Sequence, residues 1–344
     1  MCALGAESRH ENRKAALLFR ASKDILQQKG RVGEWSEAER IPGTTEGNAT
    51  YPHHQVSTPR HDTLRYRKTM GEARCAFLLI AFSAWQCDEN IAREAFNLQS
   101  FLASPQPLNA STADWHLWIQ EEADRRVKLF SFAVLNLQFI AFGTAPAIMA
   151  DEFNLRLPCS CLEWIAPNEE KWNLDALCHV LKNPQDPSSK DTLPVPSTLA
   201  NYILIHAIIQ RILLAYHVIG SFKMPFMHGL WQKAPESSLD PRNPNGPVTF
   251  TSTALLGIAY VRLSFNLGSY RILRSHNRME IANRLLRIPG LSPGPNLLPA
   301  ALHATHALSI PVKLGVNFVA RSHAFMWSVQ HSLCGLEFAI FLSK

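Results

Sequence analysis

One feature limits the possible folds of this chain more than any other, an uncharged run of twenty-two residues from Leu129 to Ala150. Such a run, when longer than about 18 residues, usually indicates a membrane-spanning helix. Gly143 and Pro146 interrupt this one, because proline lacks the amide hydrogen and clashes with the preceding turn. The unbroken helix, Val127 to Phe142, is about 24 Å long and falls short of the roughly 30 Å hydrocarbon core. The sequence therefore disfavours a membrane span here.

The better interpretation is a helix at the centre of a large helical domain, because its apolar residues cover nearly all faces. Ser111 and Asp114 have the spacing of a capping box at its start. The pairs Glu121–Arg125 and Glu122–Arg126 lie four residues apart, which favours exposed ion pairs and a solvated first half. The next most apolar segment, 199–222, carries polar residues that also disfavour a membrane span: His206, Gln210, Arg211 and His217.

Helical blocks alternate with proline-rich breaks along the chain, and no segment shows sustained strand alternation. We therefore predict an all-α fold, a single large helical domain with long proline-rich loops. Residues 1–30 contain a first amphipathic helix, and residues 31–69 are predicted to be a disordered or atypical insert. Residues 70–344 form the main domain. Its C-terminus is expected to be truncated, because Lys344 follows Phe338 to Leu342 without a stop signal.

The C-terminal block carries a near-heptad apolar stripe that starts just after Pro311 and predicts a helical length of about 45 Å. Such a stripe is most often a core face and less often a dimer seam, which leaves a homodimer open. Its members are Val312, Val316, Val319, Met326, Val329, Leu333, Leu336 and Ile340.

Composition sets broad limits. A hydrophobic content of 47% in 344 residues allows one large core or two modest ones. The net charge of +6 is spread along the chain and says little about nucleic acid by itself. Seven cysteines without framework spacing, and no N-terminal signal sequence, favour a reducing compartment. One basic segment has two interpretations, direct DNA contact or a solvated face: Arg262, Arg271, Arg274, Arg278, Arg284 and Arg287.

Metal and catalytic motifs are weak. Cys159 and Cys161 are separated by one residue, and no two-residue spacing of cysteines occurs. His303 and His306 lie one helical turn apart and could share an ion, but no third ligand is evident in the sequence nearby. No nucleophile elbow, phosphate-binding glycine loop, zincin helix or paired acidic cluster is present. We therefore predict no enzyme, no cofactor and no metal for these residues.

Three polar residues in the segment 199–222 form the sharpest candidate for a binding site. His206, Gln210 and His217 fall on nearly the same face of the predicted helix. The functional interpretation is a polar stripe that lines a ligand or partner groove. The alternative is a set of hydrogen-bonded residues at a contact between helices.

A wider pattern resembles a known family. The run EEADRRVKLFSFAVLNLQFIAFGTAPAIMADEFNLRLPCSCLEWIAPNEEKW is similar to the fungal-specific transcription factor domain, the middle homology regulatory region of fungal zinc-finger regulators. The family shows tryptophans, an E-x-x-R-R start to a buried helix, a small-Pro break, an acidic residue before Leu-Pro and a further tryptophan stretch. The matching positions are Trp115, Trp118, Glu122, Arg125, Arg126, Pro146, Asp151, Glu152, Leu157, Pro158, Trp164 and Trp172.

Segments from Asn201 and from His303 extend this resemblance over most of residues 70–344. They are similar to the subgroup in which the domain follows paired two-cysteine/two-histidine fingers. The resemblance implies a nuclear regulatory domain of an RNA polymerase II transcription factor, with the transcription machinery or co-regulator proteins as partners. Arg125 and Arg126 would then be structural. Zinc and DNA binding are expected only from fingers that are absent from this sequence.

Two expectations accompany the resemblance. Residues 31–60 interrupt a region where family members run more directly, so we interpret them as retained non-coding sequence or a lineage-specific loop. The alternative to a transcription factor region is a stand-alone helical module for protein interaction or ligand sensing, without DNA binding.

Overall fold

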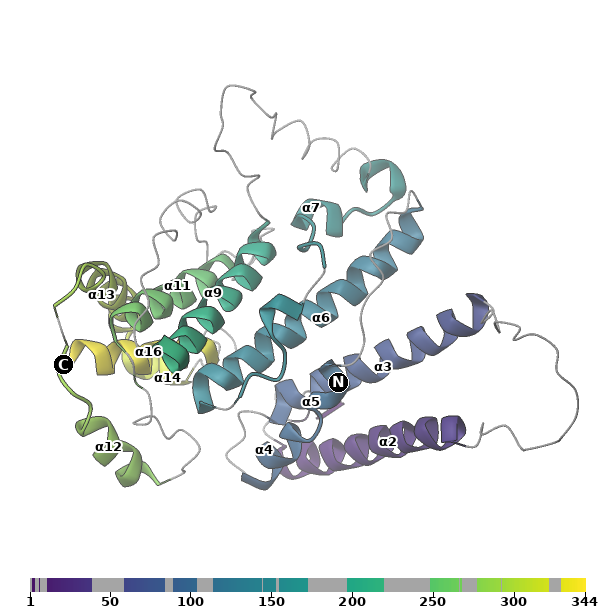
Figure 1. Cartoon of the computed structure of the whole chain (residues 1–344), viewed down its shortest axis with the longest axis horizontal. Helices are drawn as coiled ribbons and strands as arrows, with labels where there is room; N and C mark the ends of the chain where they lie inside the picture. The colour runs from purple at the N-terminus through teal and green to yellow at the C-terminus, as the bar shows by residue number, and fades with distance from the viewer. Residues whose placement is uncertain are drawn as a thin grey trace, which may run out of the picture. The chain divides into compact units, whose positions relative to one another are not determined.

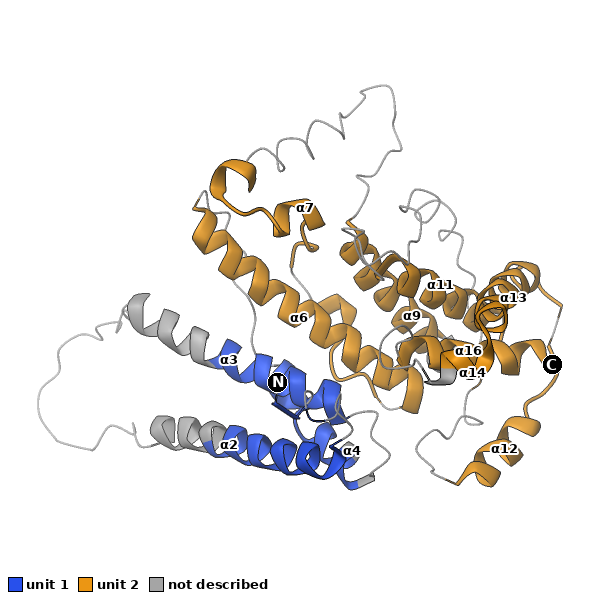
Figure 2. Ribbon diagram, turned by 180° about the vertical axis from the view of Figure 1, so that it is seen from behind, with its two compact units in different colours: residues 1–106 blue, residues 107–344 orange. Residues whose placement is uncertain are grey.

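The computed structural model contains helices and no strand in the part of the chain that it describes, which confirms the all-α prediction (Figure 1). The described residues are 2–3, 6, 11–38, 59–83, 89–103, 114–143, 145–152, 155–172, 197–219, 248–265, 267, 277–291, 293–321 and 329–344. They fall into two compact units, residues 1–106 and 107–344, instead of the single domain expected (Figure 2).

The first unit is a cluster of helices around α3 (Pro59–Ser83). The helices α2 (Asn12–Ala38), α4 (Glu89–Phe96) and α5 (Gln99–Ala103) all pack against α3. The rings of Phe19 and Phe82 lie 5.6 Å apart between α2 and α3. An ion pair between Lys23 and Glu94 joins α2 to α4.

The helices of this unit are longer than predicted. α2 continues to Ala38 past Gly30 and Gly33, and the first proline after it comes only at Pro42. α3 begins at Pro59, a residue type favoured at the first position of a helix. The predicted insert 31–69 is therefore helical at both ends, and its middle, 39–58, lies outside the described residues. The unit boundary at residue 106 also differs from the predicted boundary at residue 70.

In the second unit, α11 (Val248–Ser264) contacts α9 (Thr198–Ile219), α13 (Leu297–Leu314) and α16 (Val329–Leu342). α9 also packs against α6 (Trp115–Phe142), and α13 against α14 (Val316–Arg321). Shorter elements complete the unit: η1 (Ala150–Glu152), α7 (Cys161–Trp164) and α12 (Arg278–Leu286). α11 suits a central position because its sequence is almost entirely uncharged, and most of its residues are buried.

The long helix α6 ends as predicted but begins differently. Gly143 caps its C-terminus in the left-handed conformation, with φ 61°, which glycine adopts without steric cost. At the other end Asp114 is itself the N-cap, and its carboxylate accepts bonds from the backbone amides of His116 at 2.8 Å and Leu117 at 3.1 Å. The predicted capping box is therefore wrong, and Ser111 lies outside the described residues.

One described helical window, Thr198–Ala215 in α9, is long and apolar enough to cross a membrane by length and composition. Within this unit 61% of that window is buried. A mostly buried core helix passes the same test as a membrane span, so this window is weak support for a span.

The C-terminal apolar stripe does not form one continuous helix. Pro311 lies inside α13, and the break comes at Gly315, whose φ is 93°. Val312, Val316 and Leu336 are 68%, 62% and 37% exposed, whereas the stripe members Val319, Leu333 and Ile340 are buried. The prediction of a single helical face starting after Pro311 is therefore wrong, because the stripe is divided among α13, α14 and α16, and its described members are exposed at some positions and buried at others. Met326 lies outside the described residues.

A buried ion pair joins α11 to α16. The guanidinium of Arg262 donates from Nε and Nη2 to the two carboxylate oxygens of Glu337, each at 2.8 Å. Their side chains are 4% and 1% exposed. Arg262 is the only charged residue of α11 and Glu337 the only one of α16, so each helix buries its single charge against the other.

Replacing Arg262 alone should destabilise the protein strongly. Arg262→Met leaves the Glu337 carboxylate buried without its counter-charge, at an expected cost of about 3–5 kcal/mol in the free energy of unfolding. The double variant Arg262→Met/Glu337→Leu should recover most of this loss, because both charges are then absent. Urea unfolding followed by circular dichroism measures both, and equal losses in the single and double variants would contradict the assignment.

Candidate functional site

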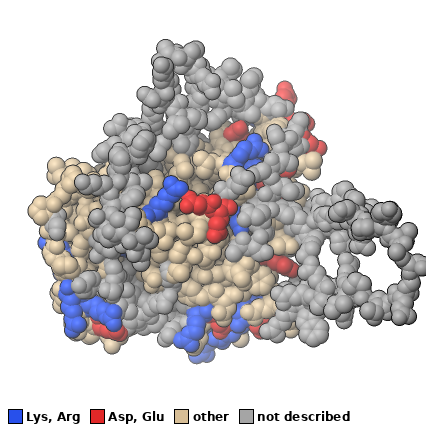
Figure 3. Space-filling model, in the orientation of Figure 1, with Lys and Arg blue, Asp and Glu red and all other residues tan. Residues whose placement is uncertain are grey.

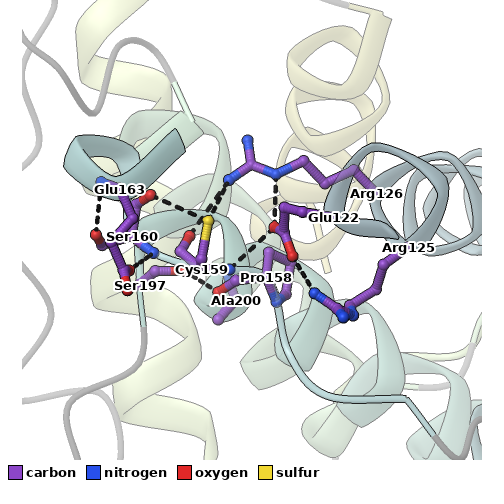
Figure 4. Close-up of polar contacts among 9 residues, drawn as sticks. All are labelled: Glu122, Arg125, Arg126, Pro158, Cys159, Ser160, Glu163, Ser197 and Ala200. Atoms are coloured by element: carbon purple, nitrogen blue, oxygen red, sulfur yellow. Dashed lines mark hydrogen bonds and ion pairs between the residues drawn. The ribbon is translucent and has the colours of Figure 1, made fainter. Parts of the chain in front are cut away.

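Three charged residues of the family pattern, Glu122, Arg125 and Arg126, meet at the carboxylate of Glu122, which is fully buried on α6 (Figure 4). This carboxylate accepts hydrogen bonds from Arg125 Nη1, from Arg126 Nε at 2.8 Å and from the backbone amide of Cys159 at 3.1 Å. Two guanidinium groups and one amide therefore compensate the buried charge. We call Glu122, Arg125, Arg126, Cys159 and Trp164 the Glu122 cluster.

Arg126 connects α6 to the segment that folds back over it. Its guanidinium lies 4.1 Å above the ring of Trp164, a cation–π contact. Its Nη2 also donates to the carbonyl oxygen of Cys159 at 3.4 Å and lies 3.3 Å from the Cys159 Sγ. A capping box formed by Ser160 and Glu163 starts α7 and so places Trp164.

The same segment is tied to the start of α9. Ser197 Oγ donates to the carbonyl oxygen of the buried Pro158 at 2.9 Å and accepts from the backbone amide of Ala200 at 3.1 Å. Figure 4 shows this chain of contacts running from α6 through residues 158–163 to α9. The cluster therefore joins three segments that are far apart in the sequence.

The chemistry of the cluster is that of a structural joint. Burial, reinforced by the negative charge of Glu122, raises the pKa of the Cys159 thiol well above its usual range. A protonated thiol is a poor nucleophile. Both carboxylate oxygens of Glu122 accept hydrogen bonds from these groups, and the side chain is fully buried, so it does not face a site open to a substrate.

The structure places the other pattern residues as follows. Trp118 contacts the ring of Trp172, with ring centroids 5.1 Å apart. Pro146 lies half-buried four residues after the end of α6. The predicted solvated first half of α6 is wrong, because Glu122, Asp124, Arg125 and Lys128 are all buried. Cys159 and Trp164, in the segment 155–172, contact Glu122 and Arg126 on this part of the helix. The local spacing of charges on the helix does not predict these contacts.

His206 and Gln210 are buried and hydrogen-bonded to neighbouring segments of the chain. The Nδ2 group of Asn136 on α6 donates to the carbonyl oxygen of His206 at 2.9 Å and lies 3.2 Å from its Nδ1. Gln210 accepts from the amide of Ala150 at 2.8 Å and donates to the carbonyl oxygen of Ile148 at 2.9 Å. The side chain of His217 lies outside the described residues.

The remaining histidine and arginine candidates are separated by the fold. His303 stacks on Tyr260 with ring centroids 4.7 Å apart, and His306 is exposed. In the described residues no group of three or more His, Cys, Asp or Glu side chains is placed to hold a metal ion. Arg262 is buried, so it cannot belong to the predicted exposed basic face.

Exposed arginines of the basic segment lie on or next to α12: Arg278, Arg284 and Arg287. Glu280 lies 3.9 Å from Arg284, and Arg271 and Arg274 lie outside the described residues. On the face drawn in Figure 3, the described basic side chains form small separate groups, several of them beside acidic ones. This surface gives little support to direct DNA contact.

One protein family and one known protein are similar to parts of this chain. Residues 266–344 match the family model of the fungal transcription factor C-terminal domain. Zinc finger protein klf1 of Schizosaccharomyces pombe is 34% identical over 64 residues, which are 19% of this chain and 8% of klf1. The chain thus matches less than a tenth of that relative's length. No solved structure matches.

The all-α fold and the C-terminal match together support a fungal transcription factor domain and indicate a role in transcription regulation. The matched segment contains α12, α13, α14 and α16. The matched family is a transcription factor domain and not an enzyme family.

Arg126→Lys should destabilise the second unit by about 1–3 kcal/mol, because lysine cannot reproduce the planar fork that contacts Glu122, Cys159 and Trp164 together. The matched control is Arg211→Lys, since Arg211 pairs with Asp151 at 2.6 Å while both side chains are largely exposed, 62% and 71%. That change should cost less than about 1 kcal/mol. Thermal and urea unfolding measure both variants, and a similar loss in the two would exclude the structural role of the cluster.

His206 should make stability depend on pH. Burial lowers its pKa from 6.5 to about 3 in the folded chain. The unfolded chain therefore takes up the proton first, so stability is full above pH 6.5 and is lost as the pH falls below it, by up to about 1.4 kcal/mol per pH unit. Burial also lowers the pKa of His331, to about 4, and adds a similar slope. Between pH 6.5 and 5, His206→Gln should show a smaller slope than wild type in urea unfolding; equal slopes would contradict the assignment.

Proposed function

We propose that this chain is the regulatory region of a fungal RNA polymerase II transcription factor, which acts in the nucleus through contacts with the transcription machinery or co-regulator proteins. The match of residues 266–344 to a fungal transcription factor C-terminal domain carries this proposal. Sequence-specific DNA binding, with its zinc, belongs in this proposal to zinc fingers that these 344 residues do not contain. The relative klf1 is named a zinc finger protein, which supports assigning DNA binding to zinc fingers and regulation to this chain.

The contacts of α11 support a regulatory domain larger than the matched segment. Arg262 precedes that segment, yet it forms its bidentate ion pair with Glu337 within it. Gln330 Nε2 donates to the hydroxyl of Tyr202 at 2.7 Å and connects α16 to α9. These contacts all lie within the unit 107–344, which we take as the core of the regulatory domain, while its start at residue 70 stays a prediction from the sequence.

Exposed apolar side chains around the end of α13 support action through protein contacts. Val312, Leu314, Val316 and Phe318 are between 44% and 68% exposed and lie within seven consecutive residues. Exposed apolar side chains of this size, concentrated in one short segment, support a protein contact there. The Glu122 cluster, with its compensated carboxylate and protonated thiol, supports the same non-catalytic role.

A reporter assay tests this function. Fused to a heterologous DNA-binding domain in a fungal host, the chain should change expression from a reporter with the corresponding site several-fold relative to the DNA-binding domain alone. Arg262→Met should lose this effect by unfolding the core, and Arg211→Lys should retain it.

The outcome that contradicts regulation is a fusion indistinguishable from the DNA-binding domain alone although it accumulates in the nucleus. The purified chain without the fusion should show no sequence-specific DNA binding in a gel-shift assay. Nanomolar, salt-resistant binding to one sequence would instead place DNA recognition within these residues.

A further inference from the structure

A cavity of about 480 Å³ lies between α11, α13 and α16 in the second unit. Its walls come from all three helices, for example Phe250 on α11, Pro311 on α13 and Phe338 on α16. Cavities of roughly 300–1,000 Å³ that are lined mainly by apolar and aromatic groups are typical of small-molecule sites. The cavity is separate from the Glu122 cluster and shares no residue with it.

The lining is uncharged. No Lys, Arg, Asp or Glu is among the described residues that line the cavity, whose polar groups are imidazoles and hydroxyls such as those of His303, His306 and Ser332. His331 stacks on Phe250 with ring centroids 4.7 Å apart, and burial lowers its pKa to about 4, so this imidazole is neutral at pH 7. A charged ligand would lose its hydration here without meeting a counter-charge.

Small residues keep the space open. Gly335 lies inside α16, where glycine is less favourable than alanine, and a Cβ at this position would meet only Leu308 Cδ2, at 4.0 Å. Phe338 lies three residues further along α16, and a Cβ at Gly257 of α11 would lie 2.8 Å from its ring. Gly257 therefore lets this ring pack tightly against α11 as a wall of the cavity, while Gly335 leaves the interior unfilled.

We propose that this cavity binds one uncharged, largely apolar organic molecule with an aromatic ring system. The rings of Phe250 and Phe338 offer it aromatic contacts, and Ser332 and His306 offer hydrogen-bonding groups. The absence of charge in the lining selects against anionic and cationic relatives of the same molecule. This site goes beyond the proposed role in transcription and does not depend on it.

Fluorescence titration of the full 344-residue chain tests the proposal with two probes that share one skeleton. N-phenyl-1-naphthylamine is neutral, and 1-anilinonaphthalene-8-sulfonate carries an added sulfonate. The neutral probe should bind saturably at one site per chain, and the sulfonate should bind at least about tenfold more weakly because of its uncompensated charge.

Gly335→Leu should fill the cavity and weaken binding of the neutral probe at least about tenfold, while it replaces a helical glycine with a better helix former. The matched control is Ala339→Leu, which adds the same side chain at an exposed position one turn further along α16. Its affinity should equal that of wild type. Ala254→Leu blocks the cavity from α11 and should repeat the loss.

Circular dichroism and melting temperature establish that each variant is folded before it is titrated. Three results would overturn the proposal: no saturable binding of the neutral probe, equal affinity for the sulfonate, or unchanged affinity in both Gly335→Leu and Ala254→Leu. A reporter fusion without effect would leave the binding result as it stands, so failure of the proposed function and failure of this site are distinguishable.

Discussion

The buried pair of Arg262 and Glu337 sets the arrangement on which the second unit depends. Each belongs to a helix that is otherwise uncharged, so neither helix can enter a core unless the two charges meet there. The bidentate geometry, with both contacts at 2.8 Å, allows one register of α11 against α16. The close approach of Gly257 to the Phe338 ring, next to Glu337, favours the same register. Helix α9 packs against α11, and helix α13 packs against both α11 and α16. The relative position of α11 and α16 therefore also influences where α9 and α13 lie.

The Glu122 cluster repeats this solution at the other end of the unit. A fully buried carboxylate again meets arginine, but here the guanidinium groups come from the same helix and the third donor is the backbone of Cys159. The cluster therefore stabilises α6 together with the segment that covers it, and Ser197 extends the connection to α9. In both places the conspicuous charged residues hold helices together, which explains why charged positions that look like a family signature carry no catalytic geometry.

Local signals in the sequence predicted what local chemistry decides. Gly143 and Pro146 showed where α6 ends, because the left-handed turn and the missing amide act within a few residues. The burial of Glu122 and the contacts of Arg126 were not predictable from their spacing, since their partners Cys159 and Trp164 lie in residues 155–172. The apolar stripe is divided among three helices, because periodicity does not report where one helix ends and the next begins. His206 and Gln210 share a helix face, but their partners on α6 and in residues 148–150 are far away in the sequence, so local spacing did not predict these contacts. One long-range signal was available, since a lone charge in an uncharged helix requires a buried partner elsewhere.

The limits of the functional unit follow from these contacts more than from the matched segment. Residues 266–344 contribute α13 and α16, but the third wall of the cavity and the counter-charge of Glu337 come from α11, which precedes the match. A fragment cut at residue 266 would bury Glu337 without Arg262 and would lose Phe250 from the cavity wall. Because loss of the bidentate contact to a buried carboxylate is strongly destabilising, such a fragment should not retain this helix packing. The smallest folded regulatory unit must therefore include α11, and the contact between Gln330 and Tyr202 extends the same requirement to α9.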